Sequence, residues 1–129
     1  MSVSTPPQPT STGLDQNVAG LLSYLFAPIS GVIFFVLEKE NRFVRFHAMQ
    51  SIIFGAASFA FWMAYTLLSM VFAFIPILGW IVTSLLGIAA GLGFFAVWVI
   101  LMVKAFQGEE WELPVLGKYA RQYSTQPVI

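Results

Sequence analysis

His47 is the only histidine of the 129-residue chain, and Gln50 and Ser51 follow it one helical turn later. Imidazole titrates near neutral pH and can donate or accept a hydrogen bond, so this group could sense pH or anchor a polar network. The alternative is a plain histidine at a membrane surface. A metal site needs several convergent ligands, and the sequence contains no cysteine. We therefore expect neither a metal ion nor a cofactor.

A second group of ionisable residues is the acidic cluster of Glu109, Glu110 and Glu112 near the C-terminus. These carboxylates can attract the arginines of an earlier charged segment, Arg42 and Arg45, and close the C-terminal segment over it. The alternative is a solvated acidic turn, because exposed ion pairs contribute only about 0 to 1 kcal/mol.

The serines of the apolar runs show no arrangement for catalysis, which requires a neighbouring base and oxyanion donors. The sequence has no glycine-rich phosphate loop with a lysine. Its net charge is zero and it has no basic patch, whereas nucleic-acid binding depends on Lys and Arg at phosphates. We therefore expect a protein that is not an enzyme and does not bind nucleic acid.

The elements that carry these residues are predicted to be membrane helices. The chain is 58% apolar and only 9% charged, which is far from the average of soluble domains. Residues 18–37, 48–73 and 80–103 are uncharged, and each is long enough to cross a hydrocarbon layer of about 30 Å. Pro76 and Gly79 mark the turn between the last two. The sequence predicts an all-α integral membrane protein with three transmembrane helices.

The predicted organisation is a Pro/Ser/Thr-rich disordered tail (1–17), a three-span membrane domain (18–123) and a short disordered tail (124–129). Inside the domain, the apolar residues from 116 to 123 recur at the spacing of one helix face. We expect a short interfacial helix there, with an ordered tail as the alternative. Asn41 is the predicted N-cap of the second span.

Pro28 lies in the middle of the first apolar run, where a proline removes a backbone hydrogen bond. One interpretation is a kinked transmembrane helix. The other is a re-entrant hairpin, which is tolerated only if neighbouring helices satisfy the freed carbonyl groups.

Orientation is predicted from the cations, because Lys and Arg collect in cytoplasmic loops. All six lie within residues 39–45 and 104–121, and the Pro76 turn has none. Three spans with the N-terminus outside and the C-terminus inside satisfy this pattern. A re-entrant first segment would place the N-terminus inside.

Helices pack in lipid through small residues that permit close approach. Two stripes repeat at every fourth position, and we expect them to meet within one chain or between chains: Ala56, Ala60 and Ala64 on the second span, and Thr83, Gly87 and Gly91 on the third.

The charged segments share one side in this topology, so we expect them to form a cytoplasmic interaction face. Its predicted members are Glu38, Glu40, Arg42, Arg45, His47, Gln50, Glu109, Glu110, Trp111 and Glu112.

Residues 13–24, 37–51 and 104–117 together resemble a family of small prokaryotic membrane proteins of unassigned function. The RFHAMQS block at residues 45–51 is the most specific part. The family is described as similar to the twenty-kilodalton component of the chloroplast Tic translocon. The resemblance implies a multi-pass protein of the prokaryotic plasma membrane that works beside other membrane proteins, and it supplies no catalytic residues.

Two functions of different classes follow. The first is a non-enzymatic interaction or assembly protein whose partners are the lipid bilayer and either a second copy or another membrane protein. The alternative is a homo-oligomeric channel or carrier for ions or small solutes. Its pathway would be lined by Ser23, Tyr24, Ser30, Gln50, Ser51 and Tyr65.

Overall fold

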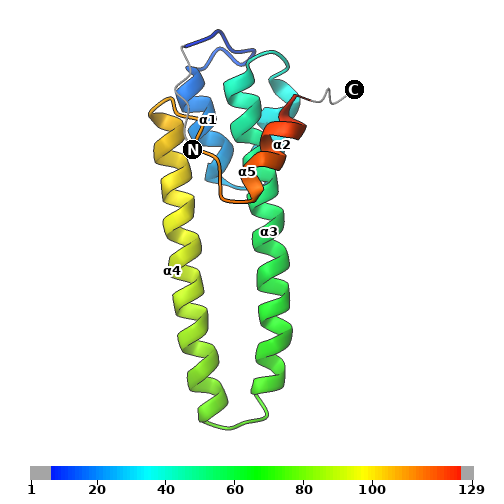
Figure 1. The fold of residues 1–129 in the computed structure, drawn as a ribbon, viewed down its shortest axis with the longest axis vertical. Helices are drawn as coiled ribbons and strands as arrows, with labels where there is room; N and C mark the ends of the chain where they lie inside the picture. The colour runs from blue at the N-terminus through cyan, green and yellow to red at the C-terminus, as the bar shows by residue number, and fades with distance from the viewer. Residues whose placement is uncertain (1–6, 126–129) are drawn as a thin grey trace.

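The computed structural model describes residues 7–125, which form five helices joined by short connections (Figure 1). The helices are α1 (Gln16–Leu25), α2 (Ile29–Leu37), α3 (Arg42–Phe72), α4 (Leu78–Phe106) and α5 (Leu116–Ser124). No strand occurs in this part of the chain. The predicted all-α fold class is confirmed.

Two of the helices, α3 and α4, are long and apolar enough to cross a membrane. Their 31 and 29 residues give lengths of about 46 and 43 Å, more than the roughly 30 Å of a hydrocarbon layer. They run antiparallel and are joined by a turn at one end of the molecule (Figure 1). Most of their apolar side chains are exposed, among them Leu67 (59%) and Leu85 (63%), as expected of surfaces that lipid covers.

The other three helices gather around the opposite end of this pair (Figure 1). There α2 and α5 pack against α3, and α1 packs against both α3 and α4. We call this end the head: it comprises residues 7–57 and 97–125. The remainder of α3 and α4 with their connecting turn, residues 58–96, is the stem.

The first apolar run differs from the kinked transmembrane helix that we considered. It forms two short helices, α1 and α2, of 10 and 9 residues, and neither is long enough to cross a bilayer. The chain reverses between them, since Asn41, just after α2, donates from Nδ2 to Oε1 of Gln16 at the start of α1 (3.1 Å). This is the geometry of the re-entrant alternative.

Neighbouring groups satisfy the carbonyls that the break at Pro28 leaves free, as the re-entrant interpretation requires. Ser30 donates from Oγ to the Ser23 carbonyl (2.7 Å), and Ser51 of α3 donates to the same oxygen. The indole N–H of Trp98 in α4 donates to the Tyr24 carbonyl (2.6 Å). The end of α1 is therefore tied to α2, α3 and α4 at once.

Glycines allow this hairpin to lie directly against α3. A Cβ on Gly55 would stand 2.5 Å from the Cβ of Pro28, and a Cβ on Gly31 would stand 2.7 Å from the carbonyl oxygen of Ala48. Real Cβ atoms do not approach so closely, so the backbones touch at these two points only because a side chain is missing.

The reversal also changes the expected topology. Residues 8 and 9 accept hydrogen bonds from Asn41 through their backbone carbonyls, so the N-terminal segment lies at the head together with α5. The prediction of three spans, with the two termini on opposite sides, does not fit this arrangement. The physical reason is Pro28, which ends α1 after fewer than three turns.

The two predicted tails lie partly outside the described residues, which exclude 1–6 and 126–129. Within the range 1–17, Ser11 donates from its backbone N and its Oγ to the Glu38 carboxylate (2.7 and 2.9 Å). Within the range 124–129, Ser124 is the last residue of α5. The expected interfacial helix at 116–123 corresponds to α5.

Two turns of the molecule share one sequence pattern and one geometry. Residues 75–79 read IPILG and residues 113–117 read LPVLG, and each turn immediately precedes a helix. Ile77 has φ +65° and Val115 has φ +69°, a conformation that costs a β-branched residue of order 1–3 kcal/mol. The following N–H bonds back to the proline carbonyl in both turns (2.7 and 2.8 Å).

Candidate functional site

At the centre of the head, three fully buried side chains, Tyr24, His47 and Gln50, form a chain of hydrogen bonds that we call the relay. His47 Nδ1 lies 2.7 Å from the Tyr24 hydroxyl, and its Nε2 lies 2.9 Å from the carbonyl oxygen of Glu109. A carbonyl can only accept, so Nε2 carries a hydrogen, and in the neutral imidazole Nδ1 then accepts from the tyrosine. The relay therefore has one direction, from Gln50 through Tyr24 and His47 to the Glu109 carbonyl.

Gln50 extends this relay into the segment that joins α4 to α5, residues 107–115, which we call the strap. The amide of Gln50 donates from Nε2 to the Tyr24 hydroxyl and to the Trp111 carbonyl, both at 2.9 Å. Its Oε1 accepts from the backbone N–H of Leu113 (2.9 Å). One side-chain amide thus pairs with the strap backbone as a neighbouring peptide group would.

Arg45 joins the ends of two helices. It is 6% exposed and donates to the carbonyls of Phe35 (3.3 Å) and Glu38 (2.8 Å), near the end of α2, and of Ser124 (2.8 Å), at the end of α5. Carbonyls at a helix C-terminus lack internal partners and carry the negative end of the helix dipole. A guanidinium group is suited to this position because it can donate in several directions.

A second polar corner fixes the start of α3. Asn41 accepts from the backbone N–H of Val44 (3.0 Å), which confirms its predicted role as N-cap. Glu38 is 1% exposed and accepts from Ser11 and from the Asn41 backbone N–H (3.2 Å). This carboxylate therefore links the N-terminal segment to the connection between α2 and α3.

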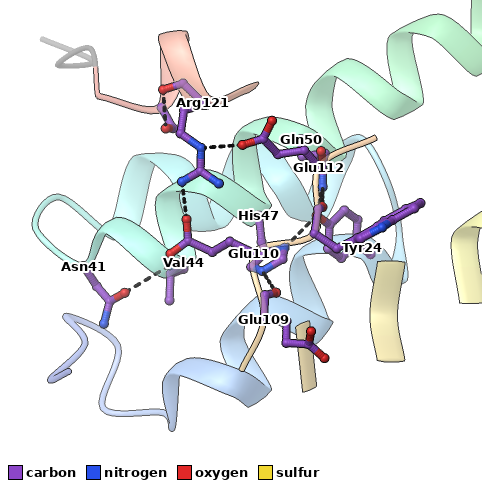
Figure 2. A network of polar contacts seen from close by, with 11 residues as sticks. Tyr24, Asn41, Val44, His47, Gln50, Glu109, Glu110, Glu112 and Arg121 are labelled. Atoms are coloured by element: carbon purple, nitrogen blue, oxygen red, sulfur yellow. Dashed lines mark hydrogen bonds and ion pairs between the residues drawn. The ribbon is translucent and has the colours of Figure 1, made fainter. Parts of the chain in front are cut away.

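The acidic cluster does close over the head, but its cations are not the ones expected. Arg121 of α5 donates from Nε to Glu112 (2.8 Å) and from Nη1 to Glu110, while Glu109 lies 3.7 Å from Lys104. Figure 2 shows Arg121 reaching from α5 to both carboxylates beside the relay. Arg42 and Arg45 do not take part in these three ion pairs. Sequence spacing could not reveal that α5 folds back onto the strap.

Two opposing effects act on the pKa of Arg121. Burial by itself lowers the pKa of its guanidinium, but the hydrogen bonds and charges of Glu110 and Glu112 outweigh burial and leave this pKa raised. The group stays protonated at any physiological pH, so the tie between α5 and the strap does not depend on its titration.

All ten residues of the predicted interaction face lie in the head, but most of them face inward. Glu38, Arg45, His47, Gln50 and Glu110 are buried, and Glu109, Trp111 and Glu112 are half-buried. Glu40 and Arg42 are exposed and line a cleft of about 410 Å³ beside α5. The structure therefore uses most of these side chains to join elements of the chain to each other.

The two small-residue stripes do not meet along their length. Ala56, Ala60 and Ala64 are exposed, and a Cβ on Gly91 would have nothing within 4 Å. Contact occurs near Gly87, where a Cβ would stand 2.6 Å from the Tyr65 hydroxyl. That hydroxyl donates to the carbonyl of Thr83. A meeting of the stripes between two chains stays a prediction.

Sequence reasoning did not identify Tyr24 and Arg121 as organising residues. Tyr24 was considered only as a possible pathway residue, although a phenol within an apolar run is a signal for a buried hydrogen bond. Arg121 carried no such signal, because its partners depend on the direction in which α5 leaves the strap.

No group of three or more His, Cys, Asp or Glu side chains within residues 7–125 is arranged to hold a metal ion. The arrangement of polar groups in the head holds the strap and the ends of the short helices in place. The relay begins at Gln50 and ends at the Glu109 carbonyl, so both of its ends are groups of the chain.

Comparisons with known proteins agree with a membrane location. The sequence model of the magnetosome magnetite crystal formation protein family matches residues 15–120. A UPF0132 membrane protein of Methanocaldococcus jannaschii is 48% identical over 116 residues, covering 89% of this chain and 94% of the relative. A second one from that organism is 40% identical over 111 residues (86% and 71%). One from Archaeoglobus fulgidus is 41% identical over 109 residues (84% and 95%). No solved structure matches.

Proposed function

The chain belongs to the magnetosome magnetite crystal formation protein family, and we propose that it is a non-enzymatic integral membrane protein with an assembly role. In this proposal the head is a rigid platform at the cytoplasmic side of the membrane. The stem binds a transmembrane helix of a second copy or of another membrane protein.

The observation that carries this proposal is an apolar groove between α3 and α4 in the stem. Its volume is about 580 Å³. It is lined by Phe61, Ala64, Tyr65, Leu68, Leu86, Ala89 and Ala90. A second groove of about 410 Å³ continues it toward the head, beside Gly93 and Val97. Alanine and glycine on the walls permit the close backbone approach by which helices associate in lipid.

The proposed topology has two spans, α3 and α4, and a re-entrant hairpin, α1 with α2. Both ends of the described chain lie at the head, which also carries all six Lys and Arg residues. Because cations collect on the cytoplasmic side, the head and both termini are proposed to face the cytoplasm of a prokaryotic cell. The turn at residues 73–77 then faces outward.

The alternative of a channel has less support from the head. The serine hydroxyls that would line its pathway bond to backbone carbonyls instead, as Ser23 does to Ala19 (2.9 Å) and Ser30 does to Ser23 (2.7 Å). A role in protein translocation, suggested by the resemblance to the Tic component, stays a prediction. The family description refers to magnetite crystal formation, but in this chain Glu110 and Glu112 pair with Arg121. The proposal is therefore membrane assembly and not mineral binding.

The test fills the groove and compares the result with a substitution at an exposed position outside it. Ala90→Phe places a large side chain between α3 and α4, and Ala96→Phe, at an exposed position away from both grooves, is the control. Crosslinking in native membranes, followed by mass spectrometry, measures the adduct with a second copy or a partner. We expect Ala90→Phe to reduce this adduct about tenfold, which corresponds to ~1.4 kcal/mol, and Ala96→Phe to leave it unchanged. Equal adduct yields in both variants would refute the role of the groove.

A further inference from the structure

The strap reaches as far down the side of α3 as the re-entrant hairpin does. Leu113 belongs to the same buried cluster as Tyr24, Phe54 and Leu101. Phe54 is next to Gly55, which contacts Pro28 at the turn of the hairpin. In Figure 1 the strap descends beside α3 and α5 then climbs back toward the end of the molecule. The strap and α5 therefore form a second shallow hairpin, next to α1 and α2.

The lowest part of this second hairpin presents apolar side chains outward. Pro114 is exposed, and Val115 is 72% exposed at a positive φ. Glycine adopts this φ without strain, and an exposed valine next to water gains nothing from burial. An apolar side chain at this strained position is explained if its surroundings are hydrocarbon and not water.

The outward face of α5 continues this pattern toward the headgroups. Tyr119 (42% exposed) and Tyr123 (46% exposed) lie four residues apart, so the two share one face of α5. The ammonium group of Lys118 lies 5.1 Å from the ring centre of Tyr119. Tyrosine rings and lysine side chains with apolar stems are typical of the membrane–water interface.

Charge pairing within the head favours an anionic partner surface. The carboxylates of Glu109, Glu110 and Glu112 are paired with cations of the chain, whereas Lys118 on α5 forms no ion pair in the described part of the structure. Anionic lipid headgroups of the cytoplasmic leaflet complement such an exposed cation.

We propose that the strap is a second membrane-dipping element, whose tip at Pro114 and Val115 enters the acyl region of the cytoplasmic leaflet. The outward face of α5 then lies at headgroup level, with Lys118 at a lipid phosphate. The occupant of this surface is the phospholipid layer itself, and α3 carries a shallow hairpin on each of two sides.

The sequence has no cysteine, so single-cysteine variants test this directly. Val115→Cys and Pro114→Cys are placed in liposomes containing phosphatidylglycerol and treated with a charged, membrane-impermeant maleimide. Arg42→Cys, exposed at the same end of the molecule, is the accessible control, and Leu85→Cys in the stem is the protected control. We expect labelling at the strap tip to be about tenfold or more slower than at position 42, because a charged reagent enters hydrocarbon poorly.

A second measurement separates lipid from protein as the covering material. A neutral fluorophore attached at position 115 is quenched by lipids brominated on their acyl chains if the tip lies in the bilayer. Protection together with quenching supports the proposal. Labelling as fast as at position 42 overturns it. Protection without quenching also overturns it, because the tip is then covered by a second copy or another protein. Two tip variants are used, so that a loss of folding in one of them is not mistaken for exposure of the strap.

Discussion

The head and the stem share the long helices α3 and α4 but are held together in different ways. In the head, buried polar side chains such as Arg45, His47 and Gln50 connect α3 to α1, to the end of α2, to the strap and to α5 through specific hydrogen bonds. In the stem, α3 and α4 are joined by one side-chain hydrogen bond between the helices, from Tyr65 to the carbonyl of Thr83, by ring contacts of Phe94 with Phe61 and Trp62, and by their turn. Lipid tails are as apolar as leucine, so burial of apolar surface cannot hold two helices together in a bilayer.

This difference indicates that the head and the stem have different roles. Each buried polar bond has a defined direction and distance, and an unmade one costs free energy in a low-dielectric environment. The head should therefore have one conformation. The stem makes few such bonds, so its helices can adjust their separation to accept a partner. Substitutions that remove buried hydrogen bonds in the head should therefore change the free energy of unfolding by more than substitutions in the stem.

The largest effect is expected at Arg45, compared with Arg42 on the same helix. Arg45→Met removes the donors of three carbonyl groups at the ends of α2 and α5. Each buried carbonyl without a partner costs about 1–3 kcal/mol, so we expect a loss of about 3 kcal/mol or more in the free energy of unfolding. Arg42→Met, at an exposed position, should change it by less than about 0.5 kcal/mol. Thermal unfolding in detergent measures both, and equal shifts would show that Arg45 has no special role.

A somewhat smaller effect is expected from Gln50→Leu. This change removes the partners of the Trp111 carbonyl and of the Leu113 N–H, at a cost of about 2–3 kcal/mol. Limited proteolysis should then cut the strap while α3 and α4 stay intact. In the stem, Thr66→Val removes a hydroxyl that bonds only to the Trp62 carbonyl of its own helix, and this variant should resist proteolysis like the unchanged protein. A strap that stays protected in Gln50→Leu would contradict the docking role of the amide.

Glycine to alanine substitutions should change the stability of the protein in opposite directions in the two regions. Gly55→Ala forces a methyl group into Pro28, and overpacking of this kind costs about 1–3 kcal/mol. A Cβ on Gly91 or Gly93 meets nothing within 4 Å, so alanine there should leave stability unchanged or raise it by up to about 1 kcal/mol through helix propensity. Melting temperatures of the three variants in one detergent provide the comparison. Destabilisation by Gly91→Ala would show that a partner helix already lies against that glycine.

The smallest effect is expected at the surface of the head. Glu112→Gln weakens an ion pair with Arg121 in which the two side chains are 31% and 36% exposed. Solvent-exposed pairs contribute about 0 to 1 kcal/mol, so the loss should stay near ~0.5 kcal/mol and shrink as salt is added. Unfolding at low and high ionic strength tests this. A loss that is large and insensitive to salt would place this pair among the buried bonds of the head.

Several features of the fold could be read from the sequence. Residues 48–103 carry no charge, and Pro76 and Gly79 divide this segment in two. This pattern predicted the two long helices and their turn. Asn41 was recognised as an N-cap from its position before an apolar run. The re-entrant hairpin was one of two interpretations, because proline at the centre of a 20-residue run is compatible with a kink or with a reversal.

The choice between these two depended on residues far away in the sequence. The hairpin exists because Ser51 and Trp98 supply donors to the end of α1 and because Gly55 leaves room for Pro28. The side of the membrane on which the N-terminus lies follows from that choice. The partners of the acidic cluster were likewise decided by the reversal at Val115, which brings Arg121 back to the strap.

By itself the sequence determined that this chain belongs in a bilayer, because long uncharged segments are more stable in hydrocarbon than in water, and that its cations gather at one end. Only the tertiary structure decided which polar groups meet. Tyr24, His47 and Gln50 are ordinary residues of an apolar chain until α1 and α3 bring them within hydrogen-bonding distance of each other and of the strap. The reason is that apolar burial depends on composition and acts without direction, whereas a hydrogen bond requires a particular partner at a particular place.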